Sequence, residues 1–191
     1  SASSSGATLE VYDWTTSVVE LHPYEPITFE GSGVDGHGAI YAVNAGTSIG
    51  YINNSMLGHS ALVMTGDATV GYAGPEGFEG TFALRNCQSF DMGGHTLTVQ
   101  GTGAYSGVNG LKSVKNPGHI VIKSGCPKFV IQSESELSGS SANTFTIEDG
   151  VNLNLLKQPS CYWGGWSSSP WTLIVKGSSQ LQFETQTSGG D

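Results

Sequence analysis

Short runs in which apolar and polar residues alternate recur along the chain, and many of them end near a glycine. A period of two places successive side chains on opposite faces of a strand, so these runs predict β-strands. The stretch from Phe90 to Gly103, FDMGGHTLTVQGTG, contains the unit: Gly93 and Gly94 form a turn, and residues 95–100 alternate. Four later segments end in a turn glycine: LTVQG (97–101), IVIKSG (120–125), FTIEDG (145–150) and TLIVKG (172–177).

The spacing of these segments indicates how the strands are arranged, because their final glycines are 24, 25 and 27 residues apart. After three of them a second alternation follows: Phe129 and Ile131, Leu153 and Leu155, Leu181 and Phe183. This period is too long for a hairpin meander and is that of one coil of a parallel β-solenoid. We therefore predict a β-solenoid of roughly seven or eight coils, about 35 Å long. One interior ladder should contain Val99, Ile122, Ile147 and Val175.

The first half of the chain has shorter alternations separated by glycine-rich or proline-containing loops. Strands are expected at 9–12, 17–21, 27–30, 39–43, 48–52 and 61–72, with loops at 31–38 and 71–77. At 191 residues the chain is of ordinary size for one domain. We expect a single domain over 1–191, with an N-terminal cap within 1–26 and a polar tail at 186–191.

The alternative all-β architecture is an antiparallel β-sandwich, because alternation alone does not distinguish the two. Sandwich strands have no reason to recur with a glycine at a fixed offset. Two-residue hairpin turns between alternating runs are also scarce, and the good candidate, Asp149-Gly150, lies inside the repeat. The solenoid is therefore preferred.

The phrase FDMGGHTLTVQGTG resembles the strand repeat of bacterial autotransporter passenger domains and related pectin-lyase-like right-handed β-helix proteins. The segments NPGHIVIKSG (116–125) and TFTIEDGVNLNL (144–155) resemble the next phrases of such repeats. This resemblance covers mainly residues 81–156 and implies a right-handed β-helix, secretion, a bacterial surface location, and adhesion or glycan handling. The chain is shorter than a full passenger domain, so we expect it to be part of a larger protein.

Composition and charge exclude several kinds of partner. Only 12% of residues are charged and the net charge is −9, which argues against nucleic acid, anionic membranes and polyuronate substrates. A β-helix lyase would need cations to neutralise its substrate, and Arg85 is the only arginine. No cofactor is expected; oxygen-rich turns such as Asp149-Gly150 are compatible with calcium. Cys87, Cys126 and Cys161 have no zinc-binding or redox spacing, and no apolar run is long enough to span a membrane.

The segment CYWGGWSSSPW (161–171) is the candidate ligand-binding site. It concentrates Tyr162, Trp163, Trp166 and Trp171 among Gly, Ser and Pro, and flat aromatic faces of this kind stack on sugar rings. The alternative is a tryptophan-rich lid that is buried against the neighbouring coil. We predict glycan contact through these four residues.

Catalytic residues are not expected, although some acidic pairs have a spacing that a glycosidase could use. These pairs are Glu134 with Glu136, Glu148 with Asp149, and Glu76 with Glu79. His95 and His119 precede successive strands and are expected to stack, most simply as polar turn positions. The function expected is a non-catalytic extracellular or cell-surface module for adhesion or glycan binding. The alternatives are a glycoside hydrolase or other polysaccharide-active enzyme on a β-helix, and a structural spacer.

Overall fold

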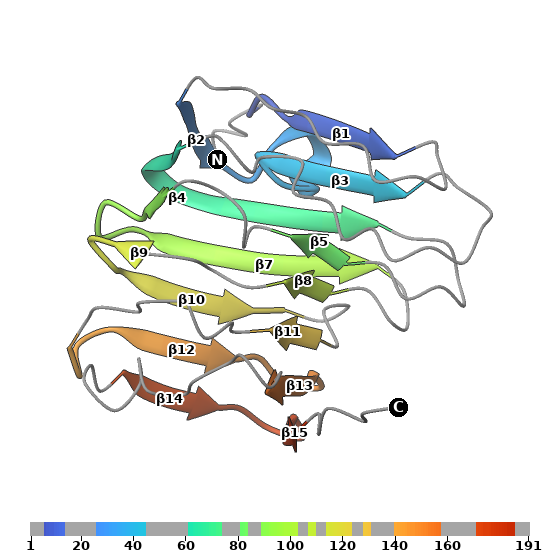
Figure 1. Cartoon of the computed structure of the whole chain (residues 1–191), viewed down its shortest axis with the longest axis vertical. Helices are drawn as coiled ribbons and strands as arrows, with labels where there is room; N and C mark the ends of the chain where they lie inside the picture. Colours follow the sequence, from blue (N-terminus) through green and yellow to red (C-terminus); the bar gives the residue numbers. More distant parts are fainter. Residues whose placement is uncertain are drawn as a thin grey trace, which may run out of the picture.

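The computed structural model describes residues 6–13, 26–44, 61–73, 81–83, 89–102, 107–109, 114–123, 128–130, 140–157 and 171–185. These residues form an all-β fold in which one short 3₁₀-helix (Val34–Gly36) is the only helical segment. The strands follow one another along the long axis of the molecule in nearly the order of the sequence (Figure 1). The predicted all-β class is confirmed.

Ten of the described strands form the first sheet. Its main path runs through β1 (Leu9–Asp13), β3 (Ile40–Asn44), β4 (Ala61–Ala73), β7 (Thr96–Thr102), β10 (His119–Ile122), β12 (Thr144–Ile147) and β14 (Thr172–Val175). Three short strands form a branch at the first part of β4: β2 (Ile27–Gly31), β6 (Ser89–Asp91) and β9 (Val114–Lys115). The 13-residue β4 therefore belongs to both the branch and the main path.

The second sheet has five described strands in the order β15, β13, β11, β8 and β5. Their bounds are Gln180–Thr185, Asn152–Lys157, Lys128–Val130, Gly107–Asn109 and Thr81–Ala83. Leu153 pairs with Leu181 and Leu155 with Phe183, which confirms that the second alternation of each repeat forms its own sheet. Ile131 lies outside the described residues.

Every pairing between the described strands is parallel. A parallel pair needs a long connection back to the same edge, which is what the repeat period supplies. The antiparallel neighbours that a β-sandwich requires are not found among these strands.

The predicted ladder is confirmed by the register of the main path. Val99 pairs with Ile122, Ile122 with Ile147, and Ile147 with Val175. The same row continues in the other direction through Val70, Ile40 and Leu9. Like side chains thus lie beside one another along the sheet, where they exclude water together.

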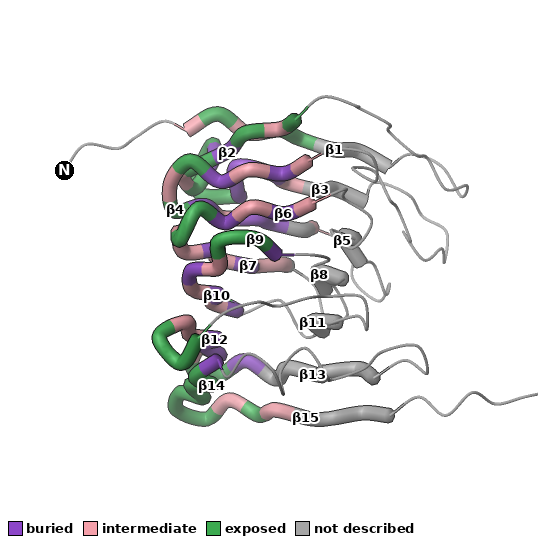
Figure 2. The backbone as a smooth tube through the Cα atoms, turned by 60° about the vertical axis from the view of Figure 1, so that its left-hand side comes forward, coloured by how far each residue is buried: buried purple, intermediate pink, exposed green. Residues whose placement is uncertain are grey.

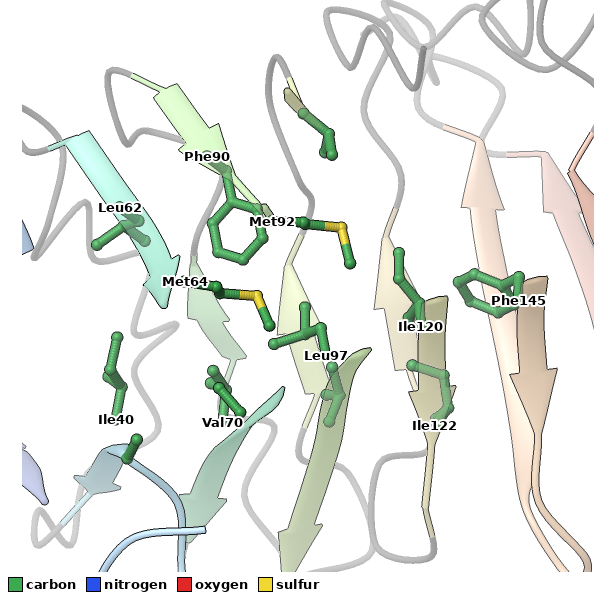
Figure 3. Close-up of a cluster of buried hydrophobic side chains, with 14 of the residues drawn as sticks. Ile40, Leu62, Met64, Val70, Phe90, Met92, Leu97, Ile120, Ile122 and Phe145 are labelled. Atoms are coloured by element: carbon green, nitrogen blue, oxygen red, sulfur yellow. The ribbon is translucent and has the colours of Figure 1, made fainter. Parts of the chain in front are cut away.

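Inward-pointing side chains of the branch and the main path form one hydrophobic core. Its largest members with no exposed surface are Phe90, Phe145, Ile40, Leu62, Met92, Leu97 and Ile120. Figure 3 shows these side chains directed into the common interior, with Met64 and Met92 between the branch and the main path. Burial alternates along β6, β7 and β10, whereas β14 is exposed throughout, as are the turns at 93–94 and 149–150 (Figure 2).

Glycines occupy turns that the sequence indicated, with two corrections. Gly71, placed in the loop predicted at 71–77, lies within β4, which extends to Ala73. Gly93, Gly94, Gly150 and Gly177 all have positive φ, between 55° and 78°, which glycine adopts without steric cost. Gly101, predicted to be a turn residue, instead lies within β7 and pairs with Tyr72 of β4. The strands expected at 17–21 and 48–52, and Gly125, lie outside the described residues.

The loop that joins β2 to β3 lies against the outer face of the main path. A Cβ on Gly71 of β4 would overlap the backbone carbonyl oxygen of His37, so glycine is needed for this close approach. Gln100 of β7 donates a hydrogen bond from Nε2 to the carbonyl oxygen of Gly36 at 2.6 Å. The rings of His37 and Tyr41 also pack together, with centroids 4.9 Å apart. Burial raises the pKa of the Tyr41 hydroxyl, and the negative charge of Glu10 raises it further.

Candidate ligand-binding site

A bulge between β2 and β4 lies beside two carboxylates, Glu30 and Asp67, that line one cavity. Phe29 pairs with Met64 but Gly31 pairs with Ala68, so Glu30 faces three residues of β4. Those three are Thr65, Gly66 and Asp67. Thr65 donates a hydrogen bond from Oγ1 to Oε2 of Glu30 at 3.0 Å. A Cβ on Gly66 would lie only 2.9 Å from that oxygen, so the glycine leaves room for the Glu30 side chain.

Asp67 is held from the opposite side by the next strand. Its Oδ1 accepts a hydrogen bond from the backbone N–H of Thr96 at 2.8 Å and lies 3.9 Å from Nδ1 of His95. The Asp67 side chain is nevertheless 76% exposed. The carboxylate is therefore oriented by the protein while it still faces solvent.

Both acids line a cavity of about 950 Å³ at the end of the stack that carries β1. Leu9, Ile27, Phe29 and Ile40 supply apolar surface to its wall. Thr28, Glu30, Thr65 and Asp67 supply hydroxyl and carboxylate groups. This volume lies in the range of small-molecule sites, which combine apolar walls with a few placed polar groups.

These groups suit a ligand that is neutral and rich in hydroxyls. Carboxylate oxygens accept hydrogen bonds and repel anions, threonine hydroxyls both donate and accept, and apolar side chains pack against C–H surfaces. Most glycosidases also need two carboxyl groups in one cavity, one on each side of the bond that is cleaved.

The sequence did not identify this cavity. Every second residue of β4 points inward, and the buried ones, Leu62, Met64, Ala68 and Val70, keep this spacing on both sides of the bulge. The alternation in the sequence therefore does not reveal the bulge. The available signal was Gly66, a glycine at an inward position with Thr65 and Asp67 on either side.

Of the predicted aromatic site, the structure describes Trp171 alone. Its side chain belongs to the hydrophobic core and is 8% exposed, as the lid alternative expects. Its Nε1 is buried without a hydrogen-bond partner in the described part of the chain. Tyr162, Trp163 and Trp166 lie outside the described residues, so glycan contact through this segment stays a prediction.

The predicted acidic pair Glu148 and Asp149 takes part in contacts between strand ends. Oε1 of Glu148 lies 3.3 Å from Nζ of Lys176. Oδ1 of Asp149 accepts hydrogen bonds from the backbone N–H and the hydroxyl of Ser178, and these bonds lower the pKa of Asp149. Glu76, Glu79, Glu134 and Glu136 lie outside the described residues, as do Cys87, Cys126 and Cys161.

The expectation that His95 and His119 stack is wrong. His119 pairs with Thr96, so the two histidines are offset by one residue. Nδ1 of His119 lies 2.9 Å from Oγ1 of Thr144 on the following strand, whereas His95 lies beside Asp67. No group of three or more His, Cys, Asp or Glu side chains within the described ranges could hold a metal ion.

Comparison with known proteins gives no relative for this chain: no family model, curated protein or solved structure matches it. The resemblance to autotransporter repeats therefore stays an expectation from the short motif. In the part of the chain that the structure describes, no helix has the length and apolar character needed to cross a membrane.

Proposed function

We propose that the chain is a right-handed β-helix and a non-catalytic module of a secreted or surface-displayed bacterial protein that binds glycans. The parallel strand order and the single-file ladder from Leu9 to Val175 support the β-helix. The motif at 90–103 supports the bacterial surface context. The cavity that Glu30 and Asp67 line is the observation that carries the binding function, because a purely structural spacer needs no pocket.

The ligand class follows from the charge of the site. Two carboxylates on a chain of net charge −9 disfavour uronates, sialic acids and sulfated sugars. A neutral hexose or N-acetylhexosamine offers hydroxyls to Glu30 and Asp67 and a C–H face to Leu9, which is 42% exposed. The Trp163 and Trp166 region is the second place where such a ligand could stack.

A glycan array that holds neutral and anionic glycans tests the proposal, with wild type and two pairs of variants. Glu30→Gln and Asp67→Asn remove the cavity's charges while they preserve side-chain size. Trp163→Ala and Trp166→Ala remove the aromatic faces. Glu148→Gln serves as the matched control, because Glu148 pairs with Lys176 outside the cavity.

Binding of neutral glycans that only the cavity variants weaken would support the cavity as the site. Loss in the tryptophan variants alone, with unchanged thermal stability, would move the site to residues 161–171. The proposal would be contradicted if wild type retained no glycan, or if it retained only anionic glycans.

A glycoside hydrolase is the second candidate, because two carboxylates lie in one cavity. Such an enzyme would hydrolyse chromogenic aryl glycosides of neutral sugars, and Glu30→Gln or Asp67→Asn would abolish turnover. This candidate would be excluded if wild type hydrolysed the glycosides that bind on the array no faster than buffer does.

A further inference from the structure

The two carboxylates of the cavity are oriented by the protein but are not neutralised by it. Oε2 of Glu30 accepts a hydrogen bond from Oγ1 of Thr65 at 3.0 Å, and Oδ1 of Asp67 accepts one from the backbone N–H of Thr96 at 2.8 Å. Neither donor carries a charge. The other oxygen of each group, Oε1 of Glu30 and Oδ2 of Asp67, accepts no hydrogen bond from a described residue. One oxygen of each acid is therefore left for a ligand.

The walls of the cavity supply no compensating charge. Besides Glu30 and Asp67, the described residues that line it are all uncharged. The basic side chain beside Asp67 is that of His95, whose Nδ1 lies 3.9 Å from Oδ1, and histidine side chains are mostly neutral above about pH 7. The chain as a whole adds to the negative potential, because its net charge is −9. At neutral pH the cavity thus attracts positive charge.

A neutral sugar satisfies the hydrogen bonds of such a site but leaves its charge uncompensated. A carboxylate only accepts hydrogen bonds, so a ligand group beside it has to donate. A sugar hydroxyl donates one hydrogen bond, and an N-acetyl group adds a carbonyl oxygen, itself an acceptor, to its single N–H. A protonated amine has three N–H donors, no acceptor and the opposite charge, and charge-assisted hydrogen bonds are roughly twice as strong as neutral ones.

We propose that the cavity selects sugars with a free, protonated amino group, such as hexosamines that lack the acetyl group, over neutral sugars with the same ring. The ammonium group pairs with Glu30 and Asp67, and the apolar wall that includes Leu9 and Ile27 contacts the C–H face of the ring. The inference rests on the proposed glycan-binding function and names the class of glycan that the cavity binds most tightly.

An organic cation suits the cavity better than a bare metal ion does. Calcium takes about six to eight oxygen ligands, whereas no group of three or more His, Cys, Asp or Glu side chains in the described ranges could hold a metal. The cavity volume of about 950 Å³ is that of a small-molecule site with apolar walls. Charge, volume and apolar surface are therefore all used only if the positive group is part of a larger organic ligand.

Isothermal titration calorimetry of the whole chain tests the proposal with the methyl glycosides of glucosamine, N-acetylglucosamine and glucose. An amine among hydroxyls titrates close to an α-amino group, at about 7.7–8.0, so at about pH 7 it is mostly protonated. EDTA in the buffer keeps stray divalent cations off the carboxylates. Because exposed charge pairs contribute modestly, we expect the amine to bind about three- to tenfold more tightly than the N-acetyl sugar.

Two changes of condition should reduce this preference without altering the protein. At about pH 9.5 the amine is deprotonated while both carboxylates stay ionised, so the preference should disappear. At about 1 M salt the Debye length falls to about 3 Å, so the preference should shrink. The affinity for the glucose glycoside should stay nearly constant in both cases.

Substitutions at the carboxylates should change the ratio of the two affinities. Glu30→Gln and Asp67→Asn each remove one charge at nearly constant side-chain size, so each should lower the preference for the amine, and the double variant should abolish it. Glu148→Gln is the matched control, because it removes a charge outside the cavity and should leave the ratio unchanged. Circular dichroism of each variant would verify that the fold is retained.

The outcomes separate this inference from the proposed function. Neutral sugars that bind as tightly as the amine would overturn the inference and leave glycan binding intact, whereas a chain that binds no sugar would contradict both. Methylammonium that binds as tightly as the glucosamine glycoside would also overturn the inference, because the site would then recognise charge without the sugar ring. A preference that persists in the double variant would overturn it as well, because the two carboxylates would not be its cause.

Discussion

Gly71 gives the sharpest test of how the β2–β3 loop is packed. The carbonyl oxygen of His37 occupies the space that a Cβ on Gly71 would need, and the Tyr41 ring lies 3.0 Å from the same point. Gly71→Ala therefore has to displace backbone, which costs about 1–3 kcal/mol of overpacking. Loss of the Gln100 hydrogen bonds to the loop adds about 1 kcal/mol. We expect a total loss of about 2–4 kcal/mol in the free energy of unfolding.

Gly66→Ala, five residues away on the same strand, is the matched control. There the added Cβ meets the carboxylate end of the Glu30 side chain, which can move, and lies 3.3 Å from the Cβ of Glu30, which has to give by only a few tenths of an ångström. Alanine also lowers the entropy lost on folding by about 0.5–1 kcal/mol, so the net change should be within about 1 kcal/mol of zero. Urea denaturation followed by far-UV circular dichroism measures both variants. Equal destabilisation by the two substitutions would refute the packing of the loop on Gly71.

Three further predictions concern the ladder, the buried tryptophan and a turn carboxylate. Ile122→Ala should lower the free energy of unfolding by about 2–5 kcal/mol, whereas Val175→Ala, at the exposed end of the ladder, should lower it by less than about 1 kcal/mol. Urea denaturation measures both, and equal losses would contradict the ladder. Trp171→Ala should lower the free energy of unfolding by about 3–5 kcal/mol, whereas Trp171→Phe, which removes the unpartnered N–H, should lower it by less than about 1.5 kcal/mol. A melting temperature of Trp171→Ala equal to that of wild type would show that this side chain does not belong to the core. Hydrogen bonds from Ser178 lower the pKa of Asp149 from its usual 3.8, so they stabilise the fold above that pH and are lost as the pH falls through the folded-state pKa. The stability deficit of Asp149→Asn at pH 7 should therefore shrink below about pH 3.8, and a deficit independent of pH in urea titrations would contradict this coupling.

The second half of the fold could be predicted because its repeats are nearly regular. Successive members of the ladder are 23, 25 and 28 residues apart from Val99 to Val175, so equivalent strands align by eye. Each member is also β-branched, and inward positions alternate strictly with outward ones. Regular spacing and a uniform core requirement together determine which residues pair.

Alternation did predict the strands of the first half that the structure describes, β1 to β4. How these strands pair, and the candidate site, could not be predicted, for specific physical reasons. There the ladder steps are 31, 30 and 29 residues from Leu9 to Val99, and they include a loop that folds onto the sheet through contacts with Gly71 and Gln100. Glu30 and Asp67 line one cavity beside a bulge in which one residue of β2 faces three of β4, and alternation does not encode that bulge. The burial of Trp171 likewise depends on tertiary packing, because composition alone fits an exposed aromatic equally well.

The strand order of the main path also determines how such a chain can change in length during evolution. Among the described strands of the ladder, β4 also pairs with β2 and β6, whereas the others pair only with the ladder strands on either side of them. Duplication of one complete unit beyond β4 therefore inserts one new strand between two existing ones. Every other strand keeps its neighbours' side chains and merely moves along the axis by one strand spacing, about 4.8 Å. Gene segments of about 25 residues could thus be gained or lost without redesign of the interior, while the cavity at the β1 end keeps its walls.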